Sequence, residues 1–294
     1  MIAKLRRTML FVPGNSPAMV KDAHIYGADS IIFDLEDSVS PFEKDAARLL
    51  VQCALEALDY GTTERVVRSN ALGTPWVEAD IRVMVAAGIE VVRLPKTESA
   101  ADIEQLERMV VEAERACGRK EGSVLLMAAI ESPLGVINAY QIARASPRMV
   151  AIALSAEDFV TSMKTTRSRE GVELAGARSR IVIAAKAAGI MAIDTVFADV
   201  ADEAGFAREV ALIKQLGFDG KSVINPNQIA PVHAAYAPGR EEVLRARRIL
   251  QAAEAAEVRG SGVTSLDGKM IDKPIVERAR RVLELARTGR PEAS

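Results

Sequence analysis

Short apolar runs recur along the chain at intervals of roughly 20–40 residues, each bounded by Gly, Pro or Asp. Ala-rich stretches with helical periodicity separate them. This alternation is typical of parallel strands that are linked by crossover helices. The pattern predicts strands at Thr8–Val12, Ser30–Leu35, Arg65–Ser69, Val91–Leu94, Val124–Ile130, Met149–Ser155, Met191–Phe197 and Lys221–Ile224.

Helices are expected in the stretches between these strands. Gly27, Gly88, Gly189 and Gly217 each follow such a stretch and precede a strand, which is the usual position of a helix C-cap. Eight strand–helix units in about 225 residues fit a (β/α)8 TIM barrel. A doubly wound open sheet is the alternative, but no Gly-x-Gly-x-x-Gly follows the first strand. The expected helices are Pro17–His24, Glu43–Leu58, Trp76–Ala86, Ala101–Cys117, Ile137–Ala145, Glu173–Ala188 and Asp202–Leu216.

The pattern changes after Pro226. Two further helices are expected at Arg240–Val258 and Pro274–Arg287, joined by a turn that contains Gly and Ser. We therefore predict two domains, a catalytic barrel over residues 1–227 and a C-terminal helical arm over residues 228–294.

Composition narrows the chemistry that the barrel can perform. The 38 Lys and Arg residues balance 40 Asp and Glu, so no electrostatic footprint for nucleic acid is present. Two His and two Cys leave little for a His-based triad or a thiolate metal site. The apolar run Met9–Val12 is too short for a signal peptide or a membrane span, so we expect a cytoplasmic protein without a membrane partner.

Polar residues gather where the predicted strands end. Active sites of TIM barrels lie at the C-terminal ends of the strands, so residues at these ends should line one pocket. The polar residues in these positions include Glu36, Asp37, Arg68, Lys96, Glu131, Asp158 and Asp194.

Glu131 and Asp158 follow consecutive strands, which lie ~4.8 Å apart in a sheet. Two carboxylates that close repel each other unless a cation or a shared proton separates them. An oxygen-only site with one or two carboxylates suits magnesium, which keeps coordination positions open for substrate. The alternative is a pair of loop acids or helix N-caps.

Arg68 follows an apolar strand and should project into the same pocket, where its planar fork suits a carboxylate or an enolate. A structural salt bridge to Glu36 or Asp37 is the alternative, and the two roles are compatible because such an acid can hold the arginine in place. Lys96 is a candidate for a Schiff-base lysine, a cation for a substrate carboxylate, or a rim charge. Asp34 alternates with the pocket residues along its strand and receives no role.

The chain contains the segments FVPGN, DSIIFDLEDSV, VVRSNAL, VVRLPKTES, AAIESPLGV, ALSAEDF, GFDGKSVINPNQI and GKMIDKP. Together these segments resemble the HpcH/HpaI aldolase and citrate lyase beta family, and the resemblance extends from about Leu5 to about Ala286. It implies a TIM barrel with Mg²⁺, or Mn²⁺, held by Glu131 and Asp158. It also implies that Arg68 and Glu131 contact the substrate and take part in catalysis.

The acyl-CoA lyases of this family place a C-terminal Asp in the active site of a neighbouring subunit, and the matching residue is Asp272. The resemblance thus implies that Asp272 is a catalytic proton donor, that the arm reaches a neighbour, and that the protein is a homo-oligomer such as a trimer or hexamer. From the pattern alone, Asp272 is an acid at a helix N-terminus. One departure is Ser69, where a hydrophobic residue is expected, but alternation should point it away from Arg68.

The reaction implied is magnesium-dependent cleavage of a citryl thioester, carried on acyl carrier protein or coenzyme A, to oxaloacetate and an acetyl thioester. The implied partners are a citrate lyase alpha (transferase) chain and a gamma (acyl carrier protein) chain. A stand-alone malyl- or citramalyl-CoA-type lyase is the first alternative. A non-catalytic ligand-binding barrel is the second, and a carboxylate pair beside Arg68 argues against it.

Overall fold

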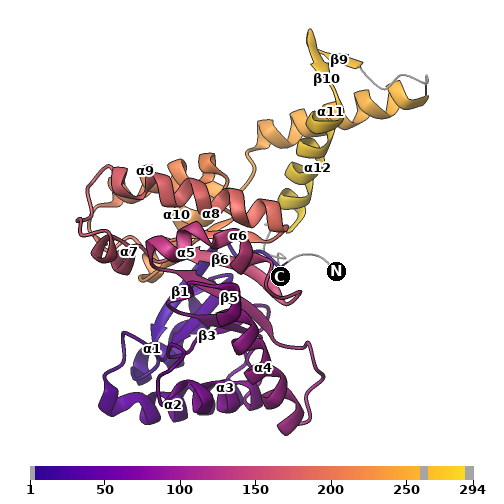
Figure 1. Ribbon diagram of the computed structural model, residues 1–294. Coiled ribbons are helices and arrows are strands. Elements are labelled where there is room, and N and C mark those ends of the chain that lie inside the picture. The colour runs from indigo at the N-terminus through magenta and orange to yellow at the C-terminus, as the bar shows by residue number, and fades with distance from the viewer. Residues whose placement is uncertain (1–3, 259–263, 289–294) are drawn as a thin grey trace. The chain divides into compact units, whose positions relative to one another are not determined.

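The computed structural model describes residues 4–258 and 264–288. Within them, eight parallel strands pair in chain order, and β8 pairs back with β1 to close a barrel. This confirms the predicted (β/α)8 TIM barrel (Figure 1). The strands are β1 Thr8–Pro13, β2 Ser30–Asp34, β3 Glu64–Arg68, β4 Val91–Leu94, β5 Leu125–Ile130, β6 Met149–Leu154, β7 Met191–Asp194 and β8 Gly220–Val223.

Helices follow the strands and surround the barrel (Figure 1). The predicted helix Ile137–Ala145 is instead two short helices, α5 and α6, which are separated at Asn138. The short helix α7 follows β6 directly and was not predicted. The helices are α1 Pro17–Asp22, α2 Lys44–Ala57, α3 Val77–Ala86, α4 Ala100–Ala116, α5 Pro133–Ile137, α6 Ala139–Ala143, α7 Ala156–Ser162, α8 Ala175–Ala188, α9 Glu203–Leu216 and α10 Ile229–Tyr236.

The chain divides into two compact units, Met1–His233 and Ala234–Ser294. The second unit contains α11 (Arg240–Val258) and α12 (Lys273–Thr288), which pack against each other. The segment between these helices includes a hairpin that the sequence analysis did not predict, formed by β9 and β10. Its turn, Asp267-Gly268, has positive φ at both residues, as a type I′ hairpin turn requires. The two hairpin strands are β9 Thr264–Leu266 and β10 Lys269–Ile271.

Among the described residues, no helix combines the length and apolarity that crossing a membrane requires.

The inside of the barrel begins with an apolar layer. Residues from seven strands pack into a single buried cluster, which is possible only within the barrel. Because side chains two residues apart on a strand share a face, the next inward residues toward the C-terminal end can be identified. Five of them are Phe11, Asp34, Arg68, Arg93 and Thr195, and most of these are polar. The apolar layer consists of Met9, Ile32, Val66, Val91, Met127, Ala151, Ala153 and Ile193.

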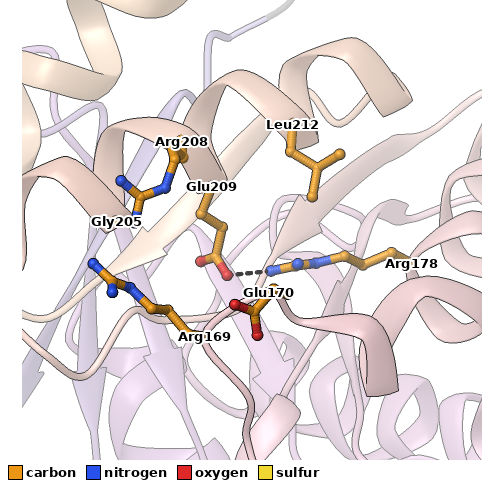
Figure 2. A pocket seen from close by; sticks show the side chains of 7 residues that line it. All are labelled: Arg169, Glu170, Arg178, Gly205, Arg208, Glu209 and Leu212. Atoms are coloured by element: carbon orange, nitrogen blue, oxygen red, sulfur yellow. Dashed lines mark ion pairs between the residues drawn. The ribbon is translucent and has the colours of Figure 1, made fainter.

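Asp194 does not join this inward set, so its predicted place in the pocket is wrong. Ile193 faces inward, and alternation therefore turns Asp194 outward toward the helices. There it is fully buried and accepts hydrogen bonds from Arg178 at 2.9 Å and from Lys221 at 3.0 Å. Glu209 binds the same two cations, and Figure 2 shows its ion pair with Arg178 beside a surface hollow between α8 and α9. This network joins strand to helix.

The loop after β1 approaches the end of β2 closely. The Gly14 N–H donates a 2.8 Å hydrogen bond to the Asp34 carbonyl oxygen. A Cβ atom at Gly14 would lie 2.8 Å from that oxygen and 2.9 Å from a methyl carbon of Leu35. Glycine is thus required for the contact that holds the end of β2 in place.

Gly14→Ala should therefore lower the free energy of unfolding by about 1–3 kcal/mol, because the added methyl group overpacks this contact. Gly176→Ala is the matched control, since a Cβ at this helical position meets nothing within 4 Å. It should stabilise the protein by about 0.5–1 kcal/mol through helix propensity. Urea denaturation of both variants measures the difference, and equal effects would contradict the close-approach argument.

Candidate active site

A cavity of about 380 Å³ opens at the C-terminal ends of the strands, a volume typical of small-molecule sites. Polar side chains from different strands and loops form much of its wall. They include Asp34 from β2, Arg68 from β3, Arg93 from β4 and Asp158 from α7. The cavity lies where the strand-end pattern predicts the active site.

Asp34 and Arg68 form the central ion pair of the cavity. They are register partners on β2 and β3, and Arg68 donates to both Asp34 carboxylate oxygens at 2.7 and 2.8 Å. Burial by itself would raise the pKa of Asp34, but the guanidinium of Arg68 holds that pKa below its ordinary value. The sequence did not assign a role to Asp34; the structure places it in the site as the partner that orients Arg68.

Glu36 connects Arg68 to Lys96. Arg68 forms a second ion pair with Glu36 at 3.0 Å, which is the salt bridge that the sequence analysis gave as the alternative role. The Lys96 amino group contacts the other oxygen of Glu36 and lies 3.3 Å from Asp37. Asp37 therefore partners Lys96, among the described contacts, and Arg68 is held by Glu36 and Asp34. Although burial opposes it, the hydrogen bond that Lys96 donates to Glu36 raises the pKa of Lys96, so the amine stays protonated and is a poor Schiff-base nucleophile.

Lys44 holds the loop that carries these acids, and the sequence did not single it out. Its buried ammonium donates to the carbonyl oxygens of Leu35 and Glu36 at 2.8 and 2.6 Å. It also lies 5.5 Å from the centre of the Trp76 ring. Because Lys44 lies on α2, no strand-end pattern could indicate this role.

Glu131, directly after β5, is a buried acid without a hydrogen-bond partner. Its side chain is only 3% exposed, and neither carboxylate oxygen has a partner among the described residues. Burial, with a contribution from the negative charge of Glu36, raises the pKa of Glu131 to about 7. A buried carboxylate in this state is costly unless a cation or a ligand satisfies it.

Asp158 lies in the first turn of α7, on the cavity wall. Its charge contributes to the raised pKa of Glu131, so the two carboxylates lie near each other. Among the residues described, no group of three or more His, Cys, Asp or Glu side chains is arranged to hold a metal. Glu131, whose oxygens have no hydrogen-bond partner, and Asp158 could together hold a hard cation that keeps water or substrate as its other ligands.

Arg93 also faces the cavity, and the sequence analysis did not select it. It shares the inward face of β4 with Val91, two residues earlier. Its guanidinium carbon lies 5.2 Å from the centre of the Phe11 ring, and that of Arg68 lies 5.0 Å from the same ring. Burial and the neighbouring Arg68 charge lower the pKa of Arg93 to about 10.

Asp272 lies in the second compact unit, at the start of α12. Its carboxylate accepts a 3.2 Å hydrogen bond from the backbone N–H of Ile275. It therefore caps the helix, as its position in the sequence indicates. The catalytic role that the resemblance implies for it stays a prediction.

Comparisons with known proteins place this chain in a family. The model of the HpcH/HpaI aldolase/citrate lyase family matches residues 7–226. The citrate lyase subunit beta of Leuconostoc mesenteroides subsp. cremoris is 58% identical over 283 residues, 96% of this chain and 94% of that protein. A (3S)-malyl-CoA thioesterase of Cereibacter sphaeroides is 32% identical over 280 residues, 95% of this chain and 94% of that protein.

A solved structure is similar over the same extent. It is the protein CitE from Mycobacterium tuberculosis in complex with magnesium, acetoacetate and coenzyme A. It matches with a TM-score of 0.78 at 31% identity, covering 96% of this chain and 98% of that one. With a family model that spans the barrel and relatives that span nearly the whole chain, the protein is a carbon–carbon lyase and belongs to the HpcH/HpaI aldolase/citrate lyase family.

Proposed function

We propose that this chain cleaves a citryl thioester to oxaloacetate and an acetyl thioester, with Mg²⁺ (or Mn²⁺) at Glu131 and Asp158. The observation that carries the proposal is the orphaned, buried carboxylate of Glu131 beside Arg68 and Asp158. The 58% identity to a citrate lyase subunit beta supports the citryl substrate. The bond that breaks joins the carbinol carbon to the methylene of the thioester. The hydroxyl loses its proton, and the methylene carbon gains one.

Glu131 and Asp158 are the residues that would hold the metal. A bound divalent cation supplies Lewis-acid polarisation of substrate oxygens, worth several kcal/mol in such sites. Glu131 must be ionised to act as a ligand, and its pKa of about 7 places that ionisation near neutral pH.

Arg68 provides a fixed positive charge for the oxygen that becomes a ketone, or for the carboxylate beside it. Asp34 and Glu36 hold its guanidinium in place at 2.7–3.0 Å, so little reorganisation is needed as charge develops. Burial would lower the pKa of Arg68, but the hydrogen bonds to Asp34 raise it, and the group stays cationic. Lys96 would act as a further substrate-binding cation at the rim, held by Glu36 and Asp37.

The acetyl enolate must receive a proton, and we assign this step to Asp272 from a neighbouring subunit. The assignment follows the match of GKMID to the C-terminal motif of related acyl-CoA lyases. It requires a homo-oligomer, for which a trimer or a hexamer is proposed. The arm over residues 228–294 would be the part that reaches the neighbour.

The thioester carrier and the partner chains follow from the same proposal. Either acyl carrier protein or coenzyme A would carry the citryl group, and transferase (alpha) and acyl carrier (gamma) chains would be the partners in the cytoplasm. The 32% identity to a malyl-CoA thioesterase keeps a stand-alone malyl- or citramalyl-CoA lyase as the second candidate.

We expect oxaloacetate release from citryl thioesters, and loss of that activity when a chelator is added. Asp158→Asn and Glu131→Gln should each lower kcat/KM about 1000-fold, the equivalent of roughly 4 kcal/mol of transition-state stabilisation. Glu121→Gln, an exposed acid paired with Arg115, is the control and should behave as wild type.

The same assay separates the candidates. Glyoxylate or pyruvate release from malyl or citramalyl thioesters, with citryl thioesters untouched, would favour the second candidate. Turnover that survives both the chelator and Asp158→Asn would refute the metal assignment.

The raised pKa of Glu131 also predicts how stability depends on pH in the metal-free protein. The folded state binds this proton up to pH about 7, whereas the ordinary value is 4.5, so the free energy of unfolding falls as pH rises between these values. Glu131→Gln removes the penalty and should stabilise the protein at pH 8 by up to about 3 kcal/mol, with little effect near pH 4.5. Urea denaturation with chelator at both pH values measures this gap. An equal difference in the free energy of unfolding between Glu131→Gln and wild type at the two pH values would count against a pKa raised by burial.

The trans role of Asp272 can be tested by complementation. Asp272→Asn keeps the helix cap but cannot donate a proton, and Glu131→Gln removes the metal ligand. Each variant alone should be inactive, whereas co-expressed subunits should recover about a quarter of wild-type activity by random assortment in a cyclic oligomer. An active Asp272→Asn protein would disprove the proton-donor role, and an absence of recovery would indicate that the arm serves its own subunit.

A further inference from the structure

Arg93 is a buried cation that forms no ion pair with a carboxylate among the described residues, although Glu131, Asp34 and Glu36 lie near enough to favour its charge. Its side chain is 1% exposed, and its polar contacts are with the hydroxyls of Ser155 and Ser222, each at 3.4 Å. These distances exceed the usual range for an N–H···O bond. The Nε atom has no partner, and no described carboxylate forms an ion pair with this guanidinium.

Other buried arginines of the chain are paired. Arg6 donates twice to Glu64 at 2.6 Å, and Arg178 donates twice to Asp194 at 2.9 Å. A buried charge without a partner destabilises the fold, so an unpaired one that lines a cavity points to an anion supplied from outside. Arg93 differs from these arginines in this respect.

Two neighbouring cations already have carboxylate partners of their own. Arg68, its register partner on β3, is compensated by Asp34 and Glu36. Lys96 is compensated by Glu36 and Asp37. Arg93 lies over the Phe11 ring, which supports its guanidinium on the cavity wall.

We propose that Arg93 binds the second carboxylate of the substrate, on the CH2–COO⁻ arm, and thereby selects citryl over citramalyl and malyl thioesters. The inference rests on the proposed function. A citryl thioester carries one carboxylate on its carbinol carbon and another on this arm. A citramalyl thioester has a methyl group in place of the arm, and a malyl thioester has hydrogen. A planar guanidinium held only by two long contacts can turn to pair with the extra carboxylate through two hydrogen bonds.

Arg93→Met, which keeps most of the length and removes the charge, tests the proposal. With saturating Mg²⁺, kcat/KM for the citryl thioester should fall about 100-fold, the loss typical of removing one partner of a buried charge pair. Cleavage of the citramalyl thioester on the same carrier should change less than about threefold, because that substrate lacks the carboxylate. Calorimetry should likewise show weaker oxaloacetate binding and unchanged pyruvate binding.

Arg115 is an exposed arginine paired with Glu121, and Arg115→Met is the matched control. It should leave kcat/KM unchanged for both substrates. If Arg93→Met does not fold, Arg93→Lys decides, because it keeps the charge but loses the planar fork. A selective loss of about tenfold for the citryl substrate then supports the proposal. Equal losses on both substrates in either variant overturn it.

A failure of the proposed function has a different signature. A wild-type enzyme that cleaves citramalyl but not citryl thioesters refutes the citryl assignment. A wild-type protein that binds pyruvate as tightly as oxaloacetate overturns the role of Arg93, whichever thioester the enzyme cleaves.

Discussion

The alternation of side chains along the barrel strands determines which charges enter the cavity and which join strand to helix. Arg68 and Arg93 follow apolar residues on the inward face, so both guanidinium groups reach the mouth. Asp194 is one position out of phase with that face and binds Arg178 and Lys221 outside the strands. A shift of one residue in a strand would exchange these roles. The ion pairs of Asp194 and Glu209 with Arg178 and Lys221, outside the strands, hold β7 and β8 against α8 and α9.

Buried charges on the two sides of the barrel wall differ in whether they have ion-pair partners. Outside the strands, each buried charge of the Asp194 network has opposite charges at hydrogen-bond distance. At the mouth, Glu131 and Arg93 form no ion pair among the described residues, and opposite charges act on them only from a longer distance. Buried charge without an ion pair reduces stability, so its occurrence at this end of the barrel fits a site that a cation and an anionic substrate complete.

Hydrogen bonds also hold the residues at the mouth of the barrel in place. Gly14 contacts the backbone of Asp34, and Lys44 binds two carbonyl oxygens of the following loop. Asp34 in turn orients Arg68 through two hydrogen bonds. A guanidinium held in this way can stabilise developing charge without a free-energy cost for reorienting its own side chain.

The sequence by itself determined the barrel, because eight apolar runs separated by amphipathic helices leave few other ways to bury their residues. It also indicated Glu131, Asp158 and Arg68, since strand ends share one edge of a parallel barrel. It did not find Asp34, Lys44 or Arg93, whose roles depend on which charges lie beside them across strands or from a helix. The hairpin between α11 and α12 carried an Asp-Gly turn signal that could have been read. Whether a charged side chain has an ion-pair partner depends on its distance from residues on other strands and helices, and only the tertiary structure decided those distances.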